Sequence, residues 1–356
     1  MPQFQGKLNS NEIFASLYNL IISVEIMSDN IKGVFGQLAD AGRVEGSMYG
    51  DQKLYYATDV LASKAWGNDA EATNLLQVNR PKDPKVQSIV LDVFRQISLT
   101  VDDYLSKRAW GDEGAFASFN SVMLGWIRET KRIYDATLYN TYIGTTVGES
   151  NINTIEVKDD GQTYPTLGQG IGEVLADLFV ELHKPSRDYN DYKFMRSYDD
   201  EDLKVVWNSK YINKVKKIDL PALFHKEGLI EKFEENVLPP SYFGTVNKLT
   251  KKTADASTRF LQETVVGDVD YFPGDKVPVG TTIADSTKIL IPTYQEDANI
   301  ICKVMHRRSV PFMSGFEVGT SFFNAKALNE NHYLTWGHNT LEYLKDKPML
   351  VVKRID

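Results

Sequence analysis

The stretch EGAFASFNSVMLGWIRETKRIYDATLYNTYI, residues 113–143, carries the strongest structural signal in the chain. Its apolar and aromatic residues recur every three or four positions, which is the spacing of one face of an α-helix. They include Phe116, Phe119, Val122, Met123, Trp126, Ile127, Ile133, Tyr134 and Leu138. No proline interrupts the stretch, and Gly144 is a suitable C-terminal cap. The pattern predicts a helix of about 30 residues, roughly 45 Å long at 1.5 Å per residue, which is unusually long for a globular protein.

Extended segments precede this helix. Residues 86–101 are rich in β-branched side chains and predict a strand. Residues 53–61 and 72–78 predict the two limbs of a long hairpin, with a turn at residues 66–69 between them. A two-stranded hairpin alone is barely stable in water. We therefore expect this hairpin to lie on another surface.

Shorter elements are predicted before and after these segments. Helical spacing marks residues 14–27, and glycines at positions 33, 36, 42 and 46 then predict a connection. After the long helix, residues 170–183 predict a short helix and residues 203–208 a buried strand. The last hundred residues predict mostly strands, at 289–293, 300–305, 312–319, 332–338 and 349–353. The fold class expected from this order is α+β, with a second domain in the middle third.

Composition narrows the classes of protein. The chain has 356 residues, 42% of them hydrophobic, and a formal net charge of -8. This share of hydrophobic residues is too high for a disordered chain. The single cysteine cannot form an intrachain disulfide. No apolar run reaches 18 residues, and the first residues lack the basic region of a signal peptide. We expect no membrane span, a reducing compartment, and no sequence-wide binding to nucleic acid.

A search for compact catalytic motifs finds none of the phosphate-loop, zinc-protease, paired-cysteine or serine-hydrolase patterns. The glycines of residues 168–172 open a predicted helix, but no convincing strand precedes them, so an ordinary turn is favoured over a phosphate site. His332 and His338 share one face of a predicted strand, but no nearby carboxylate or cysteine completes a zinc site. Cys302 lies in an apolar segment and is predicted to be buried. The acidic run at residues 199–202 favours a solvated loop over a calcium site. We therefore expect no catalytic residue, metal or cofactor.

Three basic clusters could contact phosphates. They lie at Lys214, Lys216 and Lys217, at Lys248, Lys251 and Lys252, and at Arg307 and Arg308. Lysines scattered over an acidic protein are more often part of its solvated surface. Direct contact with nucleic acid therefore stays the less favoured of two open interpretations.

The order of elements resembles a known family. FRQISLTVDDYLSKRAWGDEGAFASF, residues 94–119, looks like the strand, short helix and start of the long helix in the major capsid protein of tailed phages. HYLTWGHNTL, residues 332–341, is similar to that family's closing strand. The resemblance is to the Hong Kong 97-type fold, most closely to the phi 29-type podovirus head protein. It rests on order and spacing rather than on a strict motif.

The resemblance implies a division of the chain. Residues 1–46 would form an N-terminal arm and helix, and 47–86 an extended loop over a neighbouring subunit. Residues 87–164 would form a peripheral domain whose spine helix is 113–143. An axial domain would follow at 165–280, and 281–356 would return to the peripheral domain. Only about ten residues precede the first predicted helix, so we expect assembly to depend on a separate scaffolding protein or on shell contacts alone.

The same resemblance implies residue roles and partners. The expected contacts between subunits are Lys53, Tyr56, Lys64, Trp66, Arg80 and Lys85, and charges including Asp59 would set the register of the loop. Lys214, Lys216, Lys217, Lys251 and Lys252 are candidates to face DNA. The implied partners are other copies of the chain in pentamers and hexamers, a scaffolding protein, a portal and enclosed double-stranded DNA. The implied location is the virion, assembled in the bacterial cytoplasm, with no membrane partner.

Two alternatives stay open on the sequence. One is a related encapsulin-type shell, which encloses an enzyme rather than a genome. The other is a soluble two-domain enzyme with a site between its domains, using Asp199 or Asp202 with His225.

Overall fold

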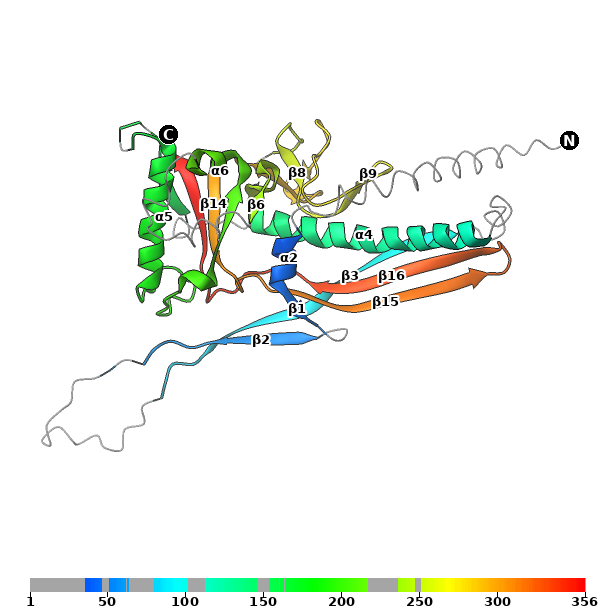
Figure 1. The fold of residues 1–356 in the computed structure, drawn as a ribbon, viewed down its shortest axis with the longest axis horizontal. Coiled ribbons are helices and arrows are strands. Elements are labelled where there is room, and N and C mark those ends of the chain that lie inside the picture. The colour runs from blue at the N-terminus through cyan, green and yellow to red at the C-terminus, as the bar shows by residue number, and fades with distance from the viewer. Residues whose placement is uncertain are drawn as a thin grey trace, which may run out of the picture.

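The computed structural model describes residues 36–46, 51–61, 63, 80–101, 113–145, 154–159, 161–162, 164–216, 236–246 and 251–355. The structure places residues 113–124, 213, 214 and 216 in helices but does not describe their side chains. The structure combines helices with two five-stranded sheets and several small sheets (Figure 1). The expected α+β class is therefore confirmed.

The first sheet has the strand order β1-β15-β16-β3-β2. These strands are β1 (Arg43–Glu45), β2 (Gln52–Ala57), β3 (Lys85–Val101), β15 (Phe312–Asn324) and β16 (Asn329–Asn339). β1 pairs in parallel with β15, and the other pairs are antiparallel. The strand predicted at residues 86–101 is confirmed as β3. The strands predicted at 312–319 and 332–338 are confirmed and are longer than expected.

A single long helix, α4 (Glu113–Thr145), lies along this sheet (Figure 1). It matches the helix predicted at residues 113–143. Ile127 and Tyr134 of α4 pack with Leu334 and Trp336 of β16 in one buried cluster. The helical spacing in the sequence therefore corresponds to the face that α4 buries against the sheet.

The second sheet has the order β4-β17-β14-β5-β6. Its strands are β4 (Thr154–Lys158), β5 (Leu203–Asn208), β6 (Val237–Leu238), β14 (Ile300–His306) and β17 (Met349–Ile355). One face packs on α5 (Leu167–His183) through residues such as Ile171 and Leu175. Another cluster joins the sheet to the end of α4 through Tyr139 and Ile143. Residues 281–356 thus supply β15 and β16 to the first sheet, and β14 and β17 to the second. The division into arm, loop, peripheral and axial domains stays a prediction.

The remaining described elements are short. They are α2 (Gln37–Gly42), η3 (Asp200–Asp202), α6 (Ser209–Lys216), η4 (Pro240–Tyr242), β7 (Gly244–Val246), β8 (Thr258–Phe260), β9 (Thr264–Val266), β10 (Val269–Tyr271), β11 (Ala284–Asp285), β12 (Lys288–Ile289) and β13 (Thr293–Glu296). Helix α5 begins three residues earlier than the predicted 170–183, because the hydroxyl of Thr166 accepts a hydrogen bond from the Gln169 amide and caps the first turn.

The pairing of the predicted hairpin differs from expectation. β2 pairs with the first residues of β3, from Gln52 opposite Val90 to Ala57 opposite Lys85. The sequence placed the return limb at residues 72–78, which lie outside the described residues, as do the turn at 66–69 and the helix at 14–27. β3 can pair with β2 because it is 17 residues long and continues past the edge of β16, which pairs with it only from Leu91 onward.

Candidate subunit interface

The β2–β3 hairpin has two unlike faces. Directly opposite residues of an antiparallel pair share a face. The inner face carries Ala57 and Ile89, which are buried, and Tyr55, which packs beside Ile89 and Leu91. This face attaches the hairpin to the body of the protein.

The outer face of the hairpin is apolar and exposed. Leu54 is 48% exposed and Tyr56 65%, and Val86, opposite Tyr56, is 48% exposed. Val90 lies on the same face and is also exposed. We call these four residues, Leu54, Tyr56, Val86 and Val90, the loop face. Contiguous exposed apolar side chains of this kind mark interaction surfaces in soluble proteins.

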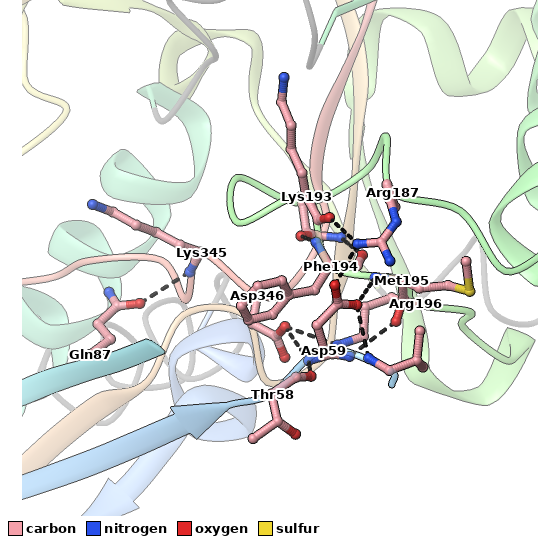
Figure 2. A network of polar contacts seen from close by, with 12 residues as sticks. Thr58, Asp59, Gln87, Arg187, Lys193, Phe194, Met195, Arg196, Lys345 and Asp346 are labelled. Atoms are coloured by element: carbon pink, nitrogen blue, oxygen red, sulfur yellow. Dashed lines mark hydrogen bonds and ion pairs between the residues drawn. The ribbon is translucent and has the colours of Figure 1, made fainter. Parts of the chain in front are cut away.

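A polar network holds the base of the hairpin against the segment that follows α5 (Figure 2). The Asp59 carboxylate accepts a hydrogen bond from Arg187 Nη1 at 2.6 Å and another from the Met195 amide at 3.1 Å. Its side chain is only 4% exposed. The hydrogen bond from Arg187 and then that from Met195 lower the pKa of Asp59 to about 2. Asp59 is therefore ionised, and the base anchored, throughout the neutral pH range.

Arg196 makes a second anchor beside the first. Its guanidinium donates to the Thr58 carbonyl oxygen at 2.8 Å and pairs with the Asp346 carboxylate at 2.7 Å. On the other limb, the Gln87 amide donates to the Tyr343 carbonyl oxygen and accepts from the Lys345 amide. Both limbs are therefore tied to segments 186–196 and 343–346, which sets the direction in which the hairpin leaves the body.

The structure describes four of the six residues predicted to contact a neighbouring subunit. Tyr56 lies on the loop face, while Lys53 is half-buried on the inner face. Arg80 and Lys85 are exposed, and Lys64 and Trp66 lie outside the described residues. Asp59 pairs with Arg187 of its own chain, and its expected part in setting the register of the loop on a neighbour stays a prediction.

The candidate DNA-facing lysines fall into two groups. Lys214 and Lys216 belong to α6, and Lys217 lies outside the described residues. Lys251 and Lys252 are exposed, and Lys251 forms an ion pair with Asp255. Part of the charge of Lys251 is therefore already balanced within the chain. A role in binding DNA stays a prediction for all five.

The candidate enzyme residues are not assembled into a site by the described residues. Asp202 lies 3.2 Å from Arg307, and Asp200 lies 3.1 Å from His183. Asp199 lies beside them, and His225 lies outside the described residues. Within the part of the chain that the structure covers, no three His, Cys, Asp or Glu residues come together as a metal site.

The remaining residues singled out in the sequence have structural partners. Cys302 is confirmed as buried, and burial raises the pKa of its thiol. His338 is buried, and its Nε2 lies 3.0 Å from the Tyr134 hydroxyl. The glycines at 168–172 lie in the first turns of α5, as expected for residues that open a helix.

Comparisons with known proteins find no matching family model and no matching curated protein. Solved structures do match. A chain from the capsid structure of Staphylococcus phage Andhra is 10% identical, with a TM-score of 0.61 over 88% of this chain and 82% of that one. A chain from the structure of the head fibre and inner core protein of bacteriophage P68 is 9% identical, with a TM-score of 0.62 over 90% and 84%. The chain has a phage capsid fold.

The backbone fold is shared with these structures, with TM-scores of 0.61 and 0.62, although the sequences are only 10% and 9% identical. The contacts at the base of the hairpin could not be predicted from the sequence, because Arg187 and Arg196 carry no local motif. The inner and outer faces of the hairpin could not be predicted either, since they depend on the register between β2 and β3. Among the described helices, none is long and apolar enough to cross a membrane.

Proposed function

We propose that this protein is the major capsid subunit of a tailed bacteriophage. The observation that carries the proposal is the capsid fold, shared over most of both chains with phage structures of similar size. In this role the chain has the Hong Kong 97-type architecture, in the phi 29-type podovirus version, and self-assembles into an icosahedral or prolate head. It performs no catalysis.

Each part of the fold has a role in such a shell. α4 is the spine helix of a peripheral domain, and the β2–β3 hairpin is the base of the extended loop of residues 47–86. The α5-covered sheet belongs to the axial domain, which meets around five-fold and six-fold centres. The anchors at Asp59 and Arg196 direct the loop outward, so that the loop face meets a neighbouring subunit.

The loop face supplies the contact energy in this proposal. Fully burying a large apolar side chain gives roughly 1.5–3 kcal/mol, before the costs of association are subtracted. Leu54 and Tyr56 are about half exposed in one subunit and therefore retain much of this gain for assembly. Charged residues around them, including Lys53, Arg80 and Lys85, select the register on the neighbour.

The enclosed cargo in this proposal is double-stranded DNA. The net charge of -8 suits a shell that encloses DNA without binding it tightly. Lys214, Lys216, Lys217, Lys251 and Lys252 would make the few contacts with phosphates, independent of sequence and sensitive to salt. A scaffolding protein and a portal complete the assembly, which takes place in the host bacterial cytoplasm and yields the virion.

The test is assembly of the purified chain, with and without a change on the loop face. Electron microscopy of the wild type is expected to show closed shells when a scaffolding protein is supplied. Leu54→Asp with Tyr56→Asp is expected to give folded subunits that do not close. The matched control is Val265→Asp, because Val265 is 63% exposed on β9, away from the hairpin.

The outcomes separate the candidate functions. A monodisperse monomer or dimer under all salt conditions, even with a scaffolding protein, would overturn the shell proposal. Normal shells from the double variant would overturn the role of the loop face alone. Sequencing of nucleic acid from particles purified from infected cells distinguishes a phage head from a compartment that encloses an enzyme.

A further inference from the structure

The outer edge of β15 is largely unpaired. β1 covers it only from Phe312 to Ser314, where the Gly46 amide also donates to the Ser314 carbonyl oxygen. On its inner side β15 pairs with β16 all the way to Asn324. Beyond Ser314, no described strand pairs with the outer edge. The described strands therefore leave the backbone groups of this edge unpaired beyond Ser314, and unpaired edge groups of this kind can bind another strand.

The end of β15 is a regular strand that begins after a bulge. Phe316 has a φ of 53°, and the register with β16 shifts between Gly315 and Val318. From Val318 opposite Thr335 to Asn324 opposite Asn329, the ladder then continues without interruption. A bulge bends the strand that carries it, so the stretch that β1 covers and the free stretch of the edge are separated by this bend. We call residues 318–324 the β15 edge.

Residues 318–324 themselves lack three features that protect edge strands from pairing, namely a charge, a proline and a bulge. Their sequence, VGTSFFN, contains no charged residue and no proline. Val318 is 40% exposed, Phe322 69% and Phe323 50%. An exposed, apolar and uncharged edge of this length is a pairing site unless something covers it.

The apolar residues are concentrated on the edge itself. Gly319 lies opposite Leu334, which packs against α4, so Val318, Thr320 and Phe322 lie on the face away from α4. The same face of the inner strands is polar. There the Gln96 side chain donates to Thr335 Oγ1 at 2.9 Å, and Thr100 Oγ1 donates to the Asn331 side chain at 2.7 Å.

We propose that the β15 edge pairs antiparallel with the β15 edge of a second copy of this chain, around a two-fold axis at Thr320. This register places Val318 opposite Phe322 twice, on the face away from α4, and Gly319 opposite Ser321 on the other face. The proposal rests on the shell function and adds to it a main-chain seam that joins two first sheets across subunits.

The charge pattern favours a second copy as the partner. The edge carries no charge, so two identical edges meet without repulsion. The nearest charge, Glu317, already pairs with Lys131 Nζ at 2.9 Å. In the proposed register Glu317 lies opposite Phe323 and not opposite another Glu317. A symmetric contact of this kind is self-complementary, as a two-fold interface requires.

A single cysteine at the axis tests the register in the full chain. Thr320→Cys is expected to give dimers under mild oxidation or with a short bismaleimide, because the two residues face each other across the axis. The native Cys302 is buried and does not interfere. Asn324→Cys is the control, since eight residues along the strand separate its two copies by about 27 Å. Thr320→Cys without dimers, or cross-linked only to another protein, would overturn the proposal.

A charge on the edge provides the second test. Phe322→Lys is expected to abolish the cross-linked dimer of Thr320→Cys, whereas Leu328→Lys, in the turn after β15, leaves it intact. Both side chains are exposed, so circular dichroism should show folded subunits. Closed shells that contain Thr320→Cys but no dimers would overturn the seam and leave the shell function standing. Dimers without shells would support the seam and count against the shell function.

Discussion

The carboxylate of Asp59 lies 2.6 Å from the guanidinium of Arg187, 128 residues further along the chain. This pair joins the end of the first limb of the hairpin to the segment that follows α5. Asp59 also accepts the Met195 amide, so one carboxylate fixes two groups of the same segment (Figure 2). The direction of the hairpin is therefore set by contacts within the chain.

Loss of the Asp59 charge should loosen the hairpin base without unfolding the protein. In Asp59→Asn the amide keeps the volume of the side chain but is a weaker acceptor for Arg187. We expect faster hydrogen exchange at residues 186–196 and at the end of β2, measured by mass spectrometry. Asp40→Asn is the control, because Asp40 pairs with Arg43 on an exposed surface. Equal exchange in Asp59→Asn and wild type would contradict the anchor.

Two glycines of α4 should respond to alanine in opposite directions. Gly125 has open space where a Cβ would lie, whereas a Cβ on Gly144 would collide with the Tyr242 carbonyl oxygen. We expect Gly125→Ala to raise the free energy of unfolding by about 0.5–1 kcal/mol, because alanine favours helix. Gly144→Ala should lower it by about 1–3 kcal/mol through overpacking. Urea denaturation measures both, and a shift of the same sign in both variants would contradict the close contact with η4.

Lys303 should make the stability of the fold depend on pH in the alkaline range. Its side chain is fully buried in β14, and Nζ donates to the Ile143 carbonyl oxygen near the end of α4 at 2.6 Å. Burial lowers the pKa of Lys303 well below its ordinary 10.5. The unfolded chain therefore binds a proton more readily than the folded chain, and the free energy of unfolding should rise with pH up to about 10.5.

The variant Lys303→Met isolates this contribution. Methionine fills a similar volume without a titrating group, so the rise in stability between about pH 7 and pH 10 should be smaller than in the wild type. Lys252→Met serves as the exposed control and should keep the full rise. An identical slope in Lys303→Met and wild type would show that the lysine titrates normally in the fold.

Cys302 should be unreactive until the protein unfolds. The thiol is fully buried between β5 and β17, and burial raises its pKa, so the reactive thiolate is scarce. An aromatic disulfide reagent should report no thiol in the native protein and one thiol per chain in denaturant. Stoichiometric reaction under native conditions would mean that β14 opens readily to solvent.

The spacing of apolar residues in the sequence was sufficient to predict the type and bounds of the elements that have a long, regular pattern. The bounds of α4 and β3 were predicted to within two residues. A helix with one buried face repeats its apolar residues every three or four positions, and a strand is marked by a run of β-branched residues, so both can be recognised from neighbouring positions. The strand of residues 203–208 was predicted with its observed bounds for the same reason. The order of these elements was also enough to point to a capsid fold.

Only the tertiary structure decided which segments meet. The sequence placed the hairpin limbs next to each other along the chain, but β2 pairs with Lys85–Val90 because β3 continues past β16. The same pairing decides that Leu54 and Tyr56 face outward while Ala57 and Ile89 are buried. The anchor between Asp59 and Arg187 likewise carries no local signature. Periodicity reports which face of an element is buried, whereas contacts between residues far apart in the chain depend on how the two sheets and α4 pack together.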